Sequence, residues 1–328
     1  MPSRRTPAPA PRALLVEKPM TMIRNALGET PLARRRALWG LALVAPNILG
    51  LFFFFGVPVL AAFATSLTEW NVLKPAEFVG LANFVRLAND ARFWQALGNT
   101  VRLLLMVVPT GVALSLGVAL LLNQRVPFRT LLRTVYFLPV VTSTVAASVV
   151  WTWIFQPRYG LLGNALAIFG LRDVNWLTRP DLVLIPIAVV TIWQRLGFDM
   201  VLFLAGLQTI PRELYEAATI DGANRWQRFR FVTLPMLSPT TFLVSVLAII
   251  NAFQIFDQVY IMTARTSRGG VGGSASTLAY YLYDSAFGRF EYGYASAVAL
   301  VLFLIILAVT VVQLRLQRRW VYYESEHG

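Results

Sequence analysis

Seven polar or aromatic side chains stand inside long apolar stretches, where ionisable groups are costly and usually carry a function. They are Gln194, Arg195, Asp199, Asn251, Gln254, Asp257 and Tyr260. Arg195 and Asp199 are four residues apart, so a helix places them on one face, about one turn apart. The spacing permits two interpretations. Either the pair neutralises itself and holds helices together, or it lines a path for a polar solute beside Gln194.

The amide side chains form a second group. Spacings of three and four residues put Asn251, Gln254 and Gln258 on one stripe of a helix. Amides both donate and accept hydrogen bonds, and aromatic rings such as that of Tyr260 are close in sequence, which suits hydroxyl-rich solutes. The alternative is that these amides bond neighbouring helices or subunits to one another. We favour the solute path.

Several kinds of chemistry are excluded by residues that the chain lacks. It has no Cys, and its one His is His327, near the end, so it offers no thiolate metal site and no histidine base in its interior. An ATP-binding Walker A loop needs Gly-Lys-Ser/Thr, and both lysines, Lys18 and Lys74, precede proline. We therefore expect no catalytic residue, metal or cofactor on this chain. Any ATP-driven work must come from a partner subunit.

The composition is that of a polytopic membrane protein. Of the 328 residues, 57% are hydrophobic and 14% are charged, whereas soluble domains are about 45–50% apolar. Six apolar stretches each reach the ~20 residues that cross the hydrocarbon core as a helix. They span residues 38–66, 100–122, 133–155, 183–206, 238–260 and 293–314. We expect an all-α fold of six transmembrane helices, several of them kinked at internal prolines.

The distribution of Lys and Arg predicts the orientation. With the N-terminus in the cytoplasm, the cytoplasmic segments carry 18 Lys and Arg and the outer segments carry 9, as the positive-inside rule requires. Because the basic residues flank apolar stretches, the net charge of +13 does not indicate nucleic-acid binding. We expect the N- and C-termini in the cytoplasm. The glycine-rich outer segment 263–276 is expected to be a flexible spacer rather than a phosphate-binding loop.

Three regions follow from this topology. Residues 1–36 are expected to be a disordered, basic cytoplasmic tail, 37–315 a transmembrane domain, and 316–328 a second cytoplasmic tail. The transmembrane domain includes one long polar cytoplasmic loop, 207–236. Its pattern predicts a helix after Pro211, a sharp turn at Asp221-Gly222, and a short second helix ending near Pro235. The pattern alone leaves open whether this loop is more than a connector.

Motifs in this loop match a known family. Glu216-Ala-Ala218, Asp221-Gly222-Ala223 and Leu234-Pro235 resemble the EAA loop of binding-protein-dependent ABC importer permeases. Other motifs resemble the sugar-permease branch of that family. They include Ile192-Trp193, Leu204-Ala-Gly-Leu-Gln208, Tyr136-Phe-Leu-Pro139, Phe256-Asp257 and Gly293-Tyr-Ala-Ser-Ala297. The resemblance covers residues 38–315, nearly the whole chain apart from its tails.

The resemblance implies partners and a location. The chain would pair with a second, homologous permease in a bacterial cytoplasmic (inner) membrane. Two ATPase subunits, which hold the ATP and Mg, would dock from the cytoplasm, and a periplasmic or lipid-anchored solute-binding protein would dock from outside. The EAA loop would be a pair of coupling helices, with Glu216 contacting the ATPase and Gly222 forming the turn. The implied coupling residues are Glu216, Ala217, Ala218, Asp221, Gly222, Ala223 and Arg225.

Our hypothesis is a permease subunit that imports a carbohydrate or polyol, polyol phosphates included, by alternating access. The first alternative is a proton-coupled secondary transporter that uses Asp199 and Asp257 as carriers and works without a partner. The second is a non-transporting membrane scaffold, in which substitution of Glu216 or Gly222 would change neither solute uptake nor ATPase association.

Overall fold

The computed structural model describes residues 31–71, 74–124, 126–157, 159–168 and 174–320. Contacts within the chain divide it into two units, residues 1–61 and 62–328. Most of the predicted N-terminal tail, and the end of the C-terminal tail, lie outside the described residues. Helix α2 already begins at Pro31, so the last residues of the predicted tail, 31–36, are helical.

The described residues of the first unit, from Pro31 onward, form one long apolar helix. α2 (Pro31–Leu51) passes through a single π turn, η1 (Phe52–Gly56), into α3 (Val57–Ser66), which continues into the second unit. Residues 35–66 include a strongly apolar stretch and are long enough to cross a membrane. Pro46 is accommodated inside α2. The first predicted span is therefore a continuous helix.

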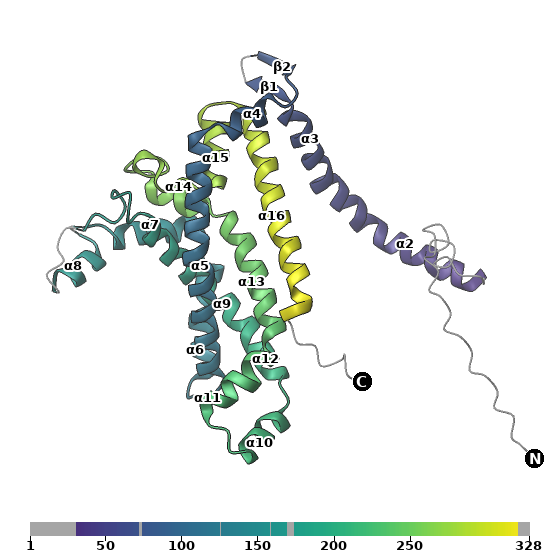
Figure 1. Ribbon diagram of the computed structural model, residues 1–328, viewed down its shortest axis with the longest axis vertical. Coiled ribbons are helices and arrows are strands. Elements are labelled where there is room, and N and C mark those ends of the chain that lie inside the picture. Colours follow the sequence, from purple (N-terminus) through teal and green to yellow (C-terminus); the bar gives the residue numbers. More distant parts are fainter. Residues whose placement is uncertain (1–30, 72–73, 125, 158, 169–173, 321–328) are drawn as a thin grey trace, which may run out of the picture. The chain divides into compact units, whose positions relative to one another are not determined.

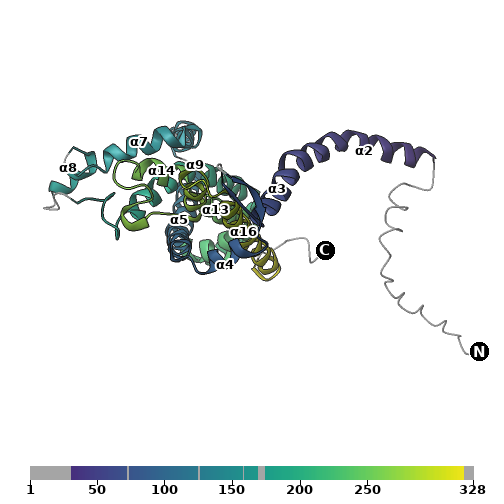
Figure 2. The ribbon, with the colours of Figure 1, turned by 90° about the horizontal axis from the view of Figure 1, so that it is seen from above.

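Four long helices form the centre of the second unit, and Figures 1 and 2 show them running alongside one another. They are α5 (Ala91–Asn123), α9 (Leu184–Thr209), α13 (Ser238–Phe253) and α16 (Tyr292–Trp320). Small residues bring the backbones close: Ala119, Ala188 and Ala248 are buried. The hydroxyl of Ser115 donates to the carbonyl four residues earlier, which satisfies a polar group in apolar surroundings.

The third predicted span is broken rather than continuous. α6 (Arg129–Phe137) leads into a 3₁₀ turn, η2 (Leu138–Val141), and then into α7 (Thr144–Ile154), with a bend of 100° between the two halves. Pro139 lies in the turn and has no N–H to continue an α-helix, which gives a physical reason for the break. The prediction of one helix over 133–155 was wrong. The short α8 (Leu161–Ile168) follows.

The fifth predicted span is broken as well. α11 (Arg225–Arg228), η3 (Phe229–Thr233) and α12 (Leu234–Met236) precede α13, with a 65° bend before Ser238. α13 ends at Phe253, and a second helix, α14, runs over Asp257–Thr263. In the described residues, four helices are long and apolar enough to span a membrane, or up to six if each bent pair counts as one span.

The fold is mostly helical, but the expectation of an all-α chain missed one hairpin. Strands β1 (Thr68–Asn71) and β2 (Lys74–Phe78) pair antiparallel, and α4 (Ala82–Ala88) follows. The Asn83 side chain donates to the carbonyls of Ser66 and Thr68 at 2.8 and 2.9 Å. These bonds hold the hairpin to α4. Figure 1 shows the hairpin and α4 at the opposite end of this unit from α10 (Arg212–Ile220) and α11.

The glycine-rich segment is an ordered turn, not the flexible spacer that was expected. It contains η4 (Val271–Gly273) and leads into α15 (Leu278–Tyr283) and η5 (Asp284–Gly288). The Asn99 side chain on α5 donates to the carbonyls of Gly273 and Ser276. The Thr100 hydroxyl accepts from the N–H of Leu278 at 2.9 Å. These contacts over a long sequence separation fix the turn against the bundle.

Candidate functional site

The polar loop folds into two helices joined by a glycine turn. α10 ends at Ile220 with Asp221 as its C-cap residue, and Gly222 follows with φ +78°. The N–H of Ala223 donates to the carbonyl of Ala218 at 2.9 Å, and the N–H of Gly222 donates to that of Thr219 at 3.1 Å. These two bonds define a Schellman motif, which favours glycine at the position with positive φ. The predicted helix, sharp turn and short helix are confirmed.

The second helix of the loop is fixed by a cap that was not anticipated. Asn224 accepts from the N–H of Gln227, and the Gln227 side chain accepts from the N–H of Asn224, so α11 begins with a capping box. The spacing of three between a capping residue and Gln is the sequence signal that identifies it. The hydroxyls of Tyr215 and Thr233 lie 3.0 Å apart. This contact ties α10 to the chain beyond α11.

The solvent-exposed surface of this loop carries large apolar side chains, although the segment as a whole is polar. Ile220, Trp226 and Phe231 are 86%, 68% and 72% exposed. Glu216 is exposed on α10, and its side chain makes no ion pair or hydrogen bond with another described residue. A rigid surface that combines exposed apolar side chains with an unpaired carboxylate is typical of a protein–protein contact.

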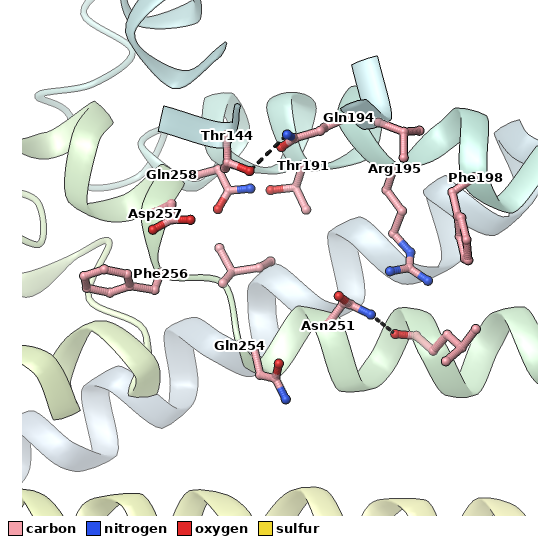
Figure 3. A pocket seen from close by; sticks show the side chains of 13 residues that line it. Thr144, Thr191, Gln194, Arg195, Phe198, Asn251, Gln254, Phe256, Asp257 and Gln258 are labelled. Atoms are coloured by element: carbon pink, nitrogen blue, oxygen red, sulfur yellow. Dashed lines mark hydrogen bonds between the residues drawn. The ribbon is translucent and has the colours of Figure 1, made fainter. Parts of the chain in front are cut away.

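A cavity of about 510 Å³ lies among η2, α7, α9, α13 and α14 (Figure 3). This volume is within the range of small-molecule sites. It is lined by Val140, Thr144, Thr191, Gln194, Arg195, Phe198, Leu247, Asn251, Gln254, Ile255, Phe256, Asp257 and Gln258. Amides, hydroxyls, one cation, one carboxylate and two phenyl rings therefore face a single space.

Two helix breaks border this cavity: the one before α7 and the one between α13 and α14. Gln194 on α9 donates to the carbonyl of Thr142 at 3.2 Å and to the hydroxyl of Thr144 at 3.0 Å. It thereby satisfies backbone that the break before α7 leaves without a helical partner, as a membrane interior requires. On another side, Gln254 and Phe256 lie in the unwound segment between α13 and α14.

The charged pair on α9 sits at the cavity wall. Arg195 donates through Nε to Oδ2 of Asp199 at 3.0 Å, and their side chains are 18% and 3% exposed. The guanidinium also lies 5.8 Å from the ring centroid of Phe198. Asp199 is buried and does not line the cavity. The predicted pairing of Arg195 with Asp199 is thus present within α9, and Arg195 reaches the cavity as well.

Five of the seven predicted path residues line the cavity, and two do not. Asp199 is buried beside its partner Arg195, and the ring centroid of Tyr260 lies 5.5 Å from that of Phe256. The single helical stripe proposed for the amides was wrong, because the helix ends at Phe253. The unwound segment brings these amides to the cavity instead. Thr144, Thr191 and Phe198 also line the cavity but carry no signal in the sequence. Their positions depend on the break before α7 and on the packing of α9.

Residues 110–322 match the family model described as binding-protein-dependent transport system inner membrane component. The chain belongs to this family. The trehalose/maltose transport system permease protein MalF of Thermococcus litoralis is 34% identical over 87% of this chain and 95% of that relative. The sulfoquinovosyl glycerol transport system permease protein SmoG of Agrobacterium fabrum is 35% identical over 86% of this chain and 91% of that relative. These permeases are transport components rather than enzymes.

A solved structure supports the same fold for this permease. One chain in the crystal structure of a bacterial alginate ABC transporter, in complex with an alginate pentasaccharide-bound periplasmic protein, matches with a TM-score of 0.76. The match covers 87% of the present chain and 96% of that chain, at 24% sequence identity. The family match and the two sugar-permease relatives confirm the sequence-based assignment to ABC permeases of the sugar branch.

Proposed function

We propose that this chain is a permease subunit of an ATP-driven importer and forms part of the translocation path for a carbohydrate or polyol. It works by alternating access between an outward-open and an inward-open arrangement. No bond in the solute is made or broken. The partners are a second homologous permease, two ATPase subunits that hold ATP and Mg, and a periplasmic or lipid-anchored solute-binding protein.

The observation that carries this proposal is the rigid turn at Gly222. The two bonds across the turn fix α10 relative to α11, and the Tyr215–Thr233 contact ties α10 to the segment that leads into α13. A displacement of this surface is therefore transmitted to α10, α11 and α13 as a rigid-body motion, because no flexible loop separates them. The exposed Glu216 and Ile220 give an ATPase an acidic and an apolar contact. This is the role we assign to Glu216, Ala217, Ala218, Asp221, Gly222, Ala223 and Arg225.

The cavity supports the solute class. Its amides and hydroxyls can donate to and accept from sugar hydroxyls, and the rings of Phe198 and Phe256 provide apolar faces. Relatives named for trehalose and maltose, and for sulfoquinovosyl glycerol, are 34% and 35% identical to this chain. We assign Gln194, Arg195, Asn251, Gln254 and Asp257 to the path, and Asp199 and Tyr260 to its supporting layer.

The proposed orientation places the coupling loop in the cytoplasm and the hairpin β1–β2 on the outer side of a bacterial inner membrane. Both chain ends are then cytoplasmic, and each bent helix pair counts as one span, giving six. The excess of Lys and Arg on the coupling-loop side supports this orientation.

The test is retention of the ATPase by the permease pair. Glu216→Ala removes an exposed carboxylate that has no partner within the described chain, so the fold should persist. Loss of one charged hydrogen bond should weaken ATPase association by about 10–100-fold. Glu77→Ala, the same change on the hairpin at the other end of the unit, is the matched control. The partner ATPase is quantified after copurification with the permease pair. Wild-type retention by Glu216→Ala would contradict the proposal.

A further inference from the structure

Asp257 is a carboxylate at the cavity wall that the fold does not neutralise. It is the first residue of α14, directly after the unwound segment, and it is exposed. In the part of the chain that the structure describes, it takes part in no ion pair and no side-chain hydrogen bond. Figure 3 shows it at one end of the cavity, with Arg195 at the other end.

The other charges at the cavity balance one another. Arg195 is the one cation among the lining residues, and Asp199 compensates its charge at 3.0 Å. The remaining lining residues are amides, hydroxyls and apolar side chains. Asp257 is therefore the one charged lining residue that has no counter-ion among the described residues.

A structural role alone explains only part of this arrangement. An acidic side chain in the first turn of a helix is favourable, and Phe256 before α14 provides no side-chain cap. An uncharged polar residue such as Asn or Ser at this first helical position would also be compatible with α14, and it would place no charge in the cavity. A carboxylate differs from these residues because it only accepts hydrogen bonds and because it repels anions.

We propose that Asp257 determines the charge class of the solute, so that the cavity admits neutral polyhydroxylated molecules and disfavours those bearing carboxylate, sulfonate or phosphate. Its two oxygens accept hydrogen bonds from adjacent hydroxyls of the solute, while nearby amides such as Gln254 and Gln258 supply donors. This inference rests on the proposed function, which places the cavity on the solute path. It narrows the expected solutes to neutral carbohydrates and polyols and excludes polyol phosphates.

The expected size of the effect follows from simple electrostatics. Two like unit charges about 6 Å apart, at an effective dielectric constant of about 20, disfavour each other by on the order of 100-fold in an equilibrium constant. Neutralising Asp257 should remove this barrier while leaving the shape of the cavity almost unchanged, because Asn is nearly isosteric with Asp. Any change in anion selectivity caused by Asp257→Asn therefore reports the charge of residue 257 and not the shape of the cavity.

The chain contains no Cys, so a single thiol can report the charge of the cavity. Gln254→Cys places the thiol three residues from Asp257, on an exposed side chain of the cavity wall. The assembled transporter, in nanodiscs, is treated with an anionic sulfonatoethyl or a cationic trimethylammonioethyl methanethiosulfonate reagent. The ratio of the two reaction rates measures the local potential. A Glu77→Cys thiol on the exposed hairpin β1–β2, at the opposite end of the unit from the coupling loop, serves as the control position.

The cationic reagent should react faster than the anionic one at Gln254→Cys. Adding Asp257→Asn should raise the anionic-to-cationic rate ratio by at least about tenfold, with no change at the control position. Asp284→Asn, which removes a carboxylate paired with Arg289, should leave the ratio at Gln254→Cys unchanged. A ratio that does not respond to Asp257→Asn would overturn the proposal.

Uptake of the transporter's own solute is followed in the same samples. Complete labelling of Gln254→Cys should block ATP-driven uptake, because the label occupies the path. Uptake that persists after complete labelling would overturn the proposed path, and the selectivity role with it. An unresponsive rate ratio combined with blocked uptake would overturn the selectivity role alone.

Discussion

The Nε atom of Arg195 donates a hydrogen bond of 3.0 Å to Oδ2 of Asp199, one turn further along α9. The second terminal nitrogen, Nη2, and the other carboxylate oxygen, Oδ1, are buried and have no hydrogen-bond partner among the described residues. The pair is therefore incompletely satisfied within this chain. Each member depends on the other for its charge balance.

Removing one member of this pair should be more harmful than removing both. Asp199→Asn leaves a guanidinium without its counter-ion in a largely buried site, which costs about 3–5 kcal/mol. The double variant Arg195→Met/Asp199→Leu should regain most of the lost thermal stability, because no unpaired charge remains. Its KM for uptake should stay raised, because Arg195 lines the cavity. Thermal unfolding of the purified transporter and uptake kinetics measure the two effects. An Asp199→Asn variant as stable as wild type would contradict this account.

The turn at Gly222 should tolerate few side chains. A Cβ there would meet no atom within 4 Å, so the cost of substitution comes from the φ of +78° alone. Gly222→Ala should cost about 1–2 kcal/mol locally and reduce ATPase retention and uptake. Gly222→Asn should recover part of both, because Asn adopts this conformation more readily. Gly98→Ala, in the interior of α5 with open space around it, is the control. Equal activity of the Ala and Asn variants would argue against a conformational role.

Gly197 should be required for packing rather than for flexibility. A Cβ at this position on α9 would lie 2.1 Å from the carbonyl oxygen of Tyr136 and 2.7 Å from Cα of Phe137. Gly197→Ala must therefore displace α9 from the broken span, at a cost of about 1–3 kcal/mol or more. Gly117→Ala, in α5 with no atom within 4 Å, should be neutral or slightly stabilising. The midpoints of thermal unfolding of the two variants are compared. Equal midpoints would show that the close approach of α9 to Tyr136 and Phe137 is not required.

Asp90 should clamp helix ends on the hairpin side of the bundle. Its carboxylate accepts hydrogen bonds from the hydroxyls of Tyr281 and Tyr294, which belong to α15 and α16. Asp90→Asn replaces one carboxylate oxygen with an amide group that cannot accept a hydrogen bond. The expected loss is about 1–3 kcal/mol of stability at neutral pH. The paired control is Asp181→Asn, an exposed carboxylate that bonds only to Arg179 two residues away among the described residues.

The pH dependence of this clamp follows from the pKa of Asp90. Partial burial raises the pKa of this carboxyl, but the hydrogen bonds from Tyr281, Tyr294 and the backbone outweigh burial, and the net pKa is lower than the ordinary 3.8. A lowered folded-state pKa stabilises the fold above the unfolded-state pKa, and this contribution is lost as pH falls through the folded-state value. The stability difference between wild type and Asp90→Asn should therefore stay constant from pH 8 to pH 5 and shrink only below about pH 4. A difference that changes near pH 6 would contradict the assignment.

Local signals were sufficient to predict much of this architecture. Pro211 and Gly222 mark the ends of α10 in the sequence, and the structure confirms both. The apolar run predicted over 183–206 corresponds to α9, which extends to Thr209. These features are set by residues within a few positions of one another, so a single sequence contains the necessary information.

Features that depend on distant contacts could not be predicted. The unwound segment at Gln254 and Phe256 carries no proline or glycine, and an apolar run does not show where a helix stops. The order of the glycine-rich turn depends on Asn99 and Thr100 of α5, more than 150 residues earlier in the chain. The cavity itself results from two helix breaks meeting beside α9. Sequence patterning identified five of its residues because polar groups are rare in membrane spans.

The central claim is that this chain transports only when an ATPase is coupled to it. The most direct measurement is solute uptake into liposomes that contain either this permease alone or the complete transporter with its second permease, ATPase and binding protein. The account predicts no net uptake by the chain alone, with or without a pH gradient, and ATP-dependent uptake by the complete transporter. Uptake by the chain alone, driven by a pH gradient and lost in Asp257→Asn, would contradict it and indicate a proton-coupled transporter instead.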